Sequence, residues 1–385
     1  MSLSYYPFSS KETQKRSEIW EALAEKKLFG GVAVALMTFS DERELEKEII
    51  PADQISLAET SVERNETWDE YVRGDVRHWF IAAASKYQCD AYPALSIPRP
   101  IHRQSQGLAE IFGASLEEVK VEPGLFHPIP CIHKPEDVDK IRVKPFEQTF
   151  YGKAVQYARY AYESTEGQLS VRNPVMTGPI DTANYLLGSM KLMEWIYDYP
   201  NELHMLLRIV TEQLIILIKA LQKAADGHLC PDHSLCLPRG YALCSEVRHM
   251  LSKETYDEFE APYLRQIGRE CGPYVYHSCG TYERLLETDM DDPNLMLINF
   301  QTKEMNLKKV YEATRGNLSM LVGRSINLAE KYLFPDEKSF YMHLFTSFPG
   351  PVPVETPVFD CSAFLEALQE TGGGTLGSRC GIRIR

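Results

Sequence analysis

The stretch from Glu202 to Asp232 reads ELHMLLRIVTEQLIILIKALQKAADGHLCPD. Its first part has apolar residues at three- and four-residue steps, which predicts an amphipathic helix over Glu202–Ala225. Its last part, Asp226–Asp232, is a short apolar run bounded by Gly and Pro, which favours a strand buried on both faces. A long helix that leads directly into a buried strand is typical of a parallel α/β arrangement. The apolar stripe of the helix contains Leu203, Leu206, Leu207, Val210, Leu214, Leu217, Ile218 and Leu221.

The same alternation of short apolar runs and longer helical patterns extends over most of the chain. Eight such units favour a closed (β/α)8 barrel, or TIM barrel, although the pattern alone also allows an open doubly wound sheet. We therefore predict an α/β fold in which residues 1–385 form a single barrel and residues 1–30 add an N-terminal helical extension. The predicted strands are Val32–Phe39, Asp90–Ile97, Leu169–Thr177, Asp226–Asp232, Pro273–Ser278, Leu295–Phe300, Leu318–Gly323 and Gly374–Arg379.

Other segments complete the fold prediction. Apolar residues at helical steps predict a helix over Leu186–Trp195, and Ser252 is a candidate N-cap for a further helix. A long charged segment, Asp41–Asn65, follows the first predicted strand. The Pro-rich segment Phe348–Pro357 is predicted to be an extended loop.

Composition narrows the classes of function. The chain has 385 residues, with 41 Lys and Arg against 54 Asp and Glu, so its net charge is −13. It has no long basic run that could follow a phosphate backbone, and we expect no nucleic-acid partner. The longest apolar stretch, Leu214–Ile218, is far too short to cross a bilayer, and we expect no membrane partner.

Cysteine usage and the first residues predict a reducing compartment. The nine cysteines are unevenly spaced and odd in number, unlike the disulfide framework of a secreted domain. Residues Met1–Ser10 are polar and aromatic, without the basic start and apolar run of a signal peptide. We therefore expect a cytoplasmic protein.

The segment Tyr274-Val-Tyr-His-Ser-Cys-Gly280 is the clearest candidate for a chemical site. His277 and Cys279 stand two residues apart at the end of a predicted strand, so their side chains project to the same side. Imidazole and thiolate together are a suitable pair of zinc ligands, but a zinc site needs at least one further ligand. The alternative is a cysteine that packs as a small core residue.

Cys380 is the candidate for the further ligand. It follows a short predicted strand in the Gly-rich segment Thr371–Gly381, and the last strands of a barrel face the middle ones across its mouth. Cys361 is the competing candidate, but it precedes an apolar pattern that predicts a helix. We prefer Cys380.

Several segments, in order and with similar spacing, resemble the uroporphyrinogen decarboxylase superfamily. The resemblance extends from about Ser170 to the C-terminus and is faint before that point. It implies a (β/α)8 barrel with its active site at the carboxyl ends of the strands. The segments that carry it are Gly178–Gly188, Leu251–Leu264, His277–Gly280 and Gly372–Gly381.

The resemblance also implies a metal site. The cobalamin-dependent and coenzyme M methyltransferases of this superfamily carry a His-x-Cys pair and a distant Cys as zinc ligands. Carried over position by position, these ligands are His277, Cys279 and Cys380.

The decarboxylase branch of the superfamily has other residues at its site. Its first strand ends in an Arg-Gln-Ala-Gly-Arg motif that holds substrate carboxylates, whereas here Met37-Thr-Phe-Ser-Asp41 contains no arginine. Its second strand ends in Phe-Ser-Asp, whose aspartate binds pyrrole N–H groups, whereas here Ile97 stands at that place. Both departures argue against porphyrinogen chemistry.

The resemblance therefore implies a zinc-dependent methyltransferase. It would move a methyl group from a methyl-corrinoid, carried by a separate corrinoid protein, to a small-molecule thiol or folate-like acceptor. Zinc suits this reaction because only a thiolate attacks a methyl group usefully, and coordination to Zn²⁺ deprotonates the thiol. A uroporphyrinogen decarboxylase-type carboxy-lyase and a catalytically inactive ligand-binding barrel are the alternatives. The oligomeric state stays open, with a homodimer as one alternative.

Further side chains are candidates for the site. Asp232 ends the fourth predicted strand and Tyr185 lies in a family-like segment, so both are predicted as catalytic or substrate-contacting residues. A solvated loop aspartate and a buried core tyrosine are the alternatives. Glu246 and Arg248 precede the helix that Ser252 begins, and a site role is the less favoured interpretation for them. Packing or loop positions are predicted for Cys230, Cys236 and Cys244.

Overall fold

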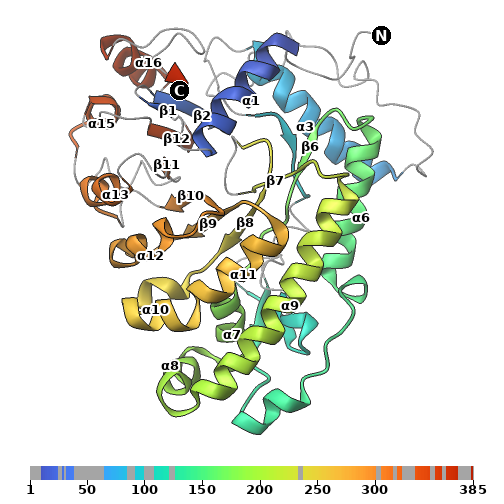
Figure 1. The fold of residues 1–385 in the computed structure, drawn as a ribbon. Helices are drawn as coiled ribbons and strands as arrows, with labels where there is room; N and C mark the ends of the chain where they lie inside the picture. The colour runs from blue at the N-terminus through green and yellow to red at the C-terminus, as the bar shows by residue number, and fades with distance from the viewer. Residues whose placement is uncertain are drawn as a thin grey trace.

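A computed structural model describes most of the chain, and it shows a mixed α/β fold with parallel strands (Figure 1). The mixed α/β class is as predicted. No helix in this part of the chain combines the length and apolarity that crossing a bilayer needs. The described residues are 10–24, 28–29, 32–38, 65–84, 92–98, 108–120, 126–232, 237–300, 305–314, 319–322, 334–346, 352–357, 361–371 and 383–384.

The larger sheet has six strands in the order β2-β12-β11-β10-β9-β8, and every neighbouring pair is parallel. Parallel neighbours place all their carboxyl ends at one edge of the sheet, which is where ligand sites form in such folds. The strands are β2 (Val32–Thr38), β8 (Tyr241–Cys244), β9 (Tyr274–Ser278), β10 (Leu295–Phe300), β11 (Ser319–Val322) and β12 (Val352–Pro357).

A second parallel sheet has the order β3-β6-β7. An isolated parallel bridge between Thr177 and Cys244 connects the segment after β6 with β8 of the larger sheet. Two antiparallel pairs lie outside these sheets, β1 with β13 and β4 with β5. Their bounds are β1 (Leu28–Phe29), β3 (Ala94–Leu95), β4 (Ser115–Glu118), β5 (Phe126–Ile129), β6 (Ser170–Arg172), β7 (Leu229–Cys230) and β13 (Arg383–Ile384).

Seven of the eight predicted strand segments contain a parallel strand, and the eighth, Gly374–Arg379, lies outside the described residues. The loop prediction for Phe348–Pro357 is wrong, because β12 forms there and pairs with β2. Prolines at 351, 353 and 357 remove backbone donors and mask the alternating Val352, Val354 and Thr356. Strand β8 was not predicted.

The long helix α9 (Pro200–Ala224) confirms the helix predicted over Glu202–Ala225, and the residues of its apolar stripe are buried. It packs against α6 (Phe150–Ser164), which lies beside it on one flank in Figure 1, and against α11 (Ala261–Cys271). The predicted helix Leu186–Trp195 is instead two helices, α7 (Pro179–Leu187) and α8 (Ser189–Asp198). They separate at Gly188, whose φ of 83° is a left-handed value that glycine adopts readily.

The remaining helices cover the sheets and connect their strands. Ser252 is the predicted N-cap, since its hydroxyl accepts the backbone N–H of Thr255 at 3.1 Å. The helices are α1 (Ser10–Ala24), α3 (Glu66–Ala84), α5 (Leu108–Ile111), α10 (Lys253–Phe259), α12 (Leu286–Met290), α13 (Leu307–Thr314), α15 (Glu337–Thr346) and α16 (Cys361–Glu370), with 3₁₀ turns at Pro135–Lys140, Phe146–Gln148, Val247–Met250 and Glu283–Leu285.

Candidate metal centre

Three neighbouring strands align three polar side chains at their carboxyl ends. In the register of the sheet, Cys244 of β8 pairs with His277 of β9, and His277 pairs with Asn299 of β10. Paired residues of parallel neighbours project to the same face, so the three side chains form a row. Cys279 follows immediately after β9 and lies on the same side as His277, because the two are two residues apart.

The imidazole of His277 is held in one orientation. Its Nδ1 lies 2.5 Å from Oδ1 of Asn299, an atom that can only accept a hydrogen bond. In the neutral imidazole, Nδ1 therefore carries the proton and donates it, which leaves the lone pair on Nε2. That atom lies 3.2 Å from Sγ of Cys279. Histidines that bind metal through one ring nitrogen usually donate a hydrogen bond from the other, as Nδ1 of His277 does here.

Glu246 brings a carboxylate to the same point. It lies just beyond the end of β8, and its Oε1 is 3.8 Å from Nε2 of His277. Its Oε2 accepts the backbone N–H of Cys279 at 3.3 Å. Glu246, His277 and Cys279 can each offer one ligand atom such that all three atoms lie within 4.8 Å of one another. The Glu246 side chain is 48% exposed, so the group opens to solvent on that side.

The donor set fits zinc in kind and in spacing. Imidazole nitrogen, thiolate sulfur and carboxylate oxygen are the ligands that Zn²⁺ takes in proteins. In a tetrahedral zinc site with bonds of about 2.0–2.3 Å, neighbouring donor atoms lie about 3.3–3.8 Å apart. The separations of 3.2 Å and 3.8 Å from His277 Nε2 are close to this range. Small side-chain movements are enough to bring all three atoms onto one ion.

Hydrogen bonds to two other parts of the molecule hold the segment of residues 245–251, which carries Glu246. Oδ1 of the buried Asp181, in the first turn of α7, accepts the N–H of Val247 at 2.8 Å, and burial raises the pKa of Asp181 to about 7. The N–H of Ser245 donates to the carbonyl of His277 at 2.9 Å. The Glu246 segment is therefore fastened both to α7 and to the strand that carries His277.

Gly280 is required by a close approach within the site. His249, on the same segment as Glu246, lies directly against Gly280, and its ring nitrogen Nδ1 is hydrogen-bonded to the carbonyl of Glu246. A Cβ added at Gly280 would collide with the His249 side chain. The glycine after Cys279 therefore allows the Glu246 segment to pack against the end of β9.

Comparison with known families identifies the chain. The family model for uroporphyrinogen decarboxylase (URO-D) matches residues 107–336. The chain belongs to the URO-D family. The match begins well before Ser170, where the resemblance in the sequence becomes faint.

Similar proteins are methyltransferases. Over 184 residues this URO-D family chain is 28% identical to a methylated-thiol–coenzyme M methyltransferase of Methanosarcina mazei. That match takes in 46% of this chain and 45% of the relative, so the chain spans a little under half the length of the curated relative it matches. A solved structure of a methyltransferase from Methanosarcina mazei shares the fold, with a TM-score of 0.61 over 93% of this chain and 97% of that one, at 14% identity. The predicted family is thus confirmed, and these relatives lie on its methyltransferase branch.

The structure brings together only part of the predicted metal site. His277 and Cys279 lie side by side, whereas Cys380 lies outside the described residues. Cys361, the competing candidate, is the first residue of α16, and its side chain lies outside the described set. The second thiolate therefore stays a prediction. Glu246, for which a site role was the less favoured interpretation, lies in the group of possible ligands. Asn299, which contacts His277, was not predicted as a site residue.

The two predicted catalytic residues, Asp232 and Tyr185, are not part of the metal centre. Asp232 follows β7, and its N–H donates to Oδ1 of the buried Asn173 at 3.2 Å. Tyr185 is a partly buried residue of α7 that packs against the core close to Tyr151. Neither belongs to the group of side chains that can share one metal ion. Their catalytic roles remain predictions.

The cysteines predicted to have packing roles differ in their surroundings. Cys230 and Cys244 are both buried, and burial raises the pKa of the Cys230 thiol to about 12 and that of Cys244 well above its usual value. Cys244, however, lies in register with His277, so its side chain projects to the same face of the sheet. Cys236 lies outside the described residues.

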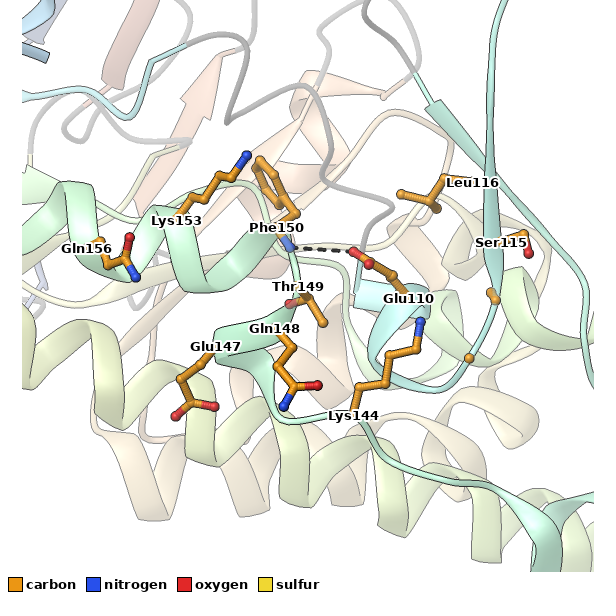
Figure 2. A pocket seen from close by; sticks show the side chains of 12 residues that line it. Glu110, Ser115, Leu116, Lys144, Glu147, Gln148, Thr149, Phe150, Lys153 and Gln156 are labelled. Carbon is orange, nitrogen blue, oxygen red and sulfur yellow. Dashed lines mark hydrogen bonds between the residues drawn. The ribbon is translucent and has the colours of Figure 1, made fainter. Parts of the chain in front are cut away.

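A separate cavity of about 910 Å³ lies between the start of β4 and the start of α6 (Figure 2). Glu110 at its wall accepts the backbone N–H of Phe150 at 3.4 Å, and Lys144 and Lys153 supply positive charge. None of the residues that line it belongs to the metal centre.

Proposed function

We propose that this URO-D family protein is a zinc-dependent methyltransferase that moves a methyl group from a methyl-corrinoid to a thiol or folate-like acceptor. One observation carries the proposal: Nε2 of His277, Sγ of Cys279 and the carboxylate of Glu246 converge on one point at the carboxyl ends of parallel strands. The similarity to methyltransferases of Methanosarcina mazei supports the same reaction class. The methyl donor would be carried by a separate corrinoid protein.

The residues of the metal centre have distinct roles in this proposal. His277 and Cys279 hold the zinc ion, and Cys380 supplies a second thiolate from the C-terminal segment. Bound zinc would lower the pKa of an acceptor thiol and so generate the nucleophilic thiolate. Asn299 keeps the lone pair of His277 on Nε2. Glu246 brings its carboxylate to the same ion from the solvent side, beside the position that an incoming thiol would take.

We also infer that the two parallel sheets are arcs of one closed (β/α)8 barrel within a single domain. The Thr177–Cys244 bridge supports this, because it extends the pairing from the β3-β6-β7 sheet toward β8. The shared fold with a methyltransferase structure over 93% of this chain supports it as well. In a barrel, Asp232 and Tyr185 would face the mouth in which the acceptor binds.

The reaction is tested with free methylcobalamin as the methyl donor and a panel of thiols as acceptors. The spectral change at cobalt reports demethylation. We expect thiol-dependent turnover that disappears on zinc removal and returns when zinc is restored. Turnover that survives complete zinc removal, or decarboxylation of uroporphyrinogen by the wild-type protein, would overturn the proposed function.

A further inference from the structure

The side chain of Arg248 is completely buried two residues beyond Glu246. A guanidinium is costly to remove from water unless it is paired, so its place in the core needs a reason. Its Nη2 lies 2.5 Å from Oδ2 of Asp289, at the end of α12. The hydroxyl of Tyr256 donates to the other oxygen of Asp289 at 2.7 Å. The charge is therefore neutralised deep inside the protein.

Three tyrosine rings surround the guanidinium. Its central carbon, Cζ, lies 4.5 Å from the ring centroid of Tyr276 and 4.2 Å from that of Tyr282. A third ring, that of Tyr256, is 5.1 Å away. Nε and Nη1 make no hydrogen bond to any described residue, which is consistent with a cation held over aromatic faces.

The three rings form a cage around the guanidinium. Two of them belong to residues that flank the predicted metal ligands in the sequence. Tyr276 immediately precedes His277, and Tyr282 is the third residue after Cys279. One guanidinium thus contacts both ends of the segment that bears the nitrogen and sulfur donors. The same guanidinium belongs to the segment that bears Glu246.

The outer side of the Glu246 segment is held independently. The guanidinium of Arg284 donates to the carbonyl of His249 at 2.6 Å and to that of Leu251 at 2.5–2.8 Å. These contacts restrain the end of the segment that is farther from Glu246. Arg248 is the contact that reaches across to the ends of the His277–Cys279 segment.

We propose that Arg248 is a positioning residue for the metal centre. It locks the segment of Glu246 to the segment of His277 and Cys279, so that the carboxylate faces the nitrogen–sulfur pair. The inference rests on the proposed function, because it assigns Glu246 a place at the metal ion. Arg248 itself does not touch the metal or the substrate.

A double-mutant cycle in zinc affinity tests the inference. Zinc affinity is measured by competition with a chromophoric chelator for the wild type, Arg248→Lys, Glu246→Gln and the double variant. Lysine keeps the charge beside Asp289 but loses the flat contact with the rings. We expect each single variant to bind zinc about tenfold more weakly or worse, as for other residues that support metal ligands. We expect the double variant to bind no more weakly than Glu246→Gln alone.

Further variants keep the result interpretable. Arg239→Lys alters a surface arginine that pairs with Glu21 at 2.7 Å and should leave zinc affinity unchanged. If Arg248→Lys does not fold, as judged by circular dichroism, Tyr282→Leu is compared with Tyr282→Phe. Both lose the hydrogen bond to the carbonyl of Asn299 at 3.2 Å, but only Tyr282→Leu also loses the ring beside Arg248. Relative to Tyr282→Phe, Tyr282→Leu should show the same coupling to Glu246→Gln.

The possible failures are distinguishable. A wild-type protein that binds no zinc overturns the proposed function and this inference with it. A wild-type protein that binds zinc normally, with losses from Arg248→Lys and Glu246→Gln that multiply in the double variant, overturns only the positioning role. Unchanged zinc affinity in Arg248→Lys would likewise overturn only the positioning role.

Discussion

Nδ1 of His277 lies 2.5 Å from Oδ1 of Asn299 on the neighbouring strand, and this contact turns Nε2 toward Cys279. The pairing of β9 with β10 places the two residues directly opposite each other. The orientation of the predicted metal ligand is thus fixed by strand register.

Removing the amide should therefore weaken metal binding without unfolding the protein. In Asn299→Ala, the His277 ring can rotate and take up either tautomer, so we expect zinc affinity to fall about 10–100-fold. Chelator competition measures the change. Gln156→Ala, which removes an amide from the separate cavity, is the control and should bind zinc like the wild type. Equal affinity of Asn299→Ala and the wild type would show that the contact does not orient a ligand.

Replacement of Gly280 should disturb the same centre by steric means. Gly280→Ala pushes against His249 and with it against the segment of Glu246, so we expect both zinc affinity and melting temperature to fall. Gly74→Ala is the matched control, because Gly74 lies within α3 and a Cβ added there meets no atom within 4 Å. Alanine is favoured over glycine in a helix by about 1 kcal/mol, so the control should melt at the same temperature or higher. A Gly280→Ala protein with wild-type zinc binding would contradict this account.

The buried carboxyl of Glu260 should make stability depend on pH. Its oxygens accept the hydroxyl of Tyr276 at 2.5 Å and the N–H of Ile180 at 2.8 Å, and burial raises its pKa from 4.5 to about 8. The folded state then binds more protons than the unfolded state between these values. The free energy of unfolding therefore falls as pH rises through this window, by at most about 1.4 kcal/mol per pH unit, and levels off above it.

Glu260→Gln isolates this contribution, since the amide is neutral at every pH. We expect the wild type to lose stability relative to Glu260→Gln between pH 5 and pH 8, on the order of a few kcal/mol. Urea unfolding at pH 5, 7 and 9 provides the comparison. Parallel stability curves for the two proteins would mean that the folded-state pKa of Glu260 is close to its ordinary value.

Much of the fold follows from patterns in the sequence. The stripe of α9 and the apolar runs of β9 and β10 predict their elements almost to the residue. Strand β8 was not predicted because Tyr241–Cys244 is only four residues long. All four residues are buried, so the segment shows no alternation of apolar and polar residues. The prolines of β12 led to a loop prediction, although pairing with β2 stabilises a strand there. Both errors concern strands that tertiary pairing defines more than local propensity does.

The site was predictable only where it is local in sequence. His277 and Cys279 follow from spacing along one strand, which needs no knowledge of the neighbours. Glu246 became recognisable only with β8, because that strand carries it to the edge next to His277. Asn299 depends on the register between β9 and β10, and a single sequence does not contain that information.

Zinc content of the purified protein is the most direct test of the central claim that His277 and Cys279 belong to a metal centre. We expect about one zinc per chain in the wild type and much less in Cys279→Ser, because a serine hydroxyl stays protonated where a thiolate ligand is needed. Cys131→Ser changes another partly exposed cysteine and should retain the metal. A wild-type protein without zinc, or a Cys279→Ser protein that retains it fully, would contradict the account.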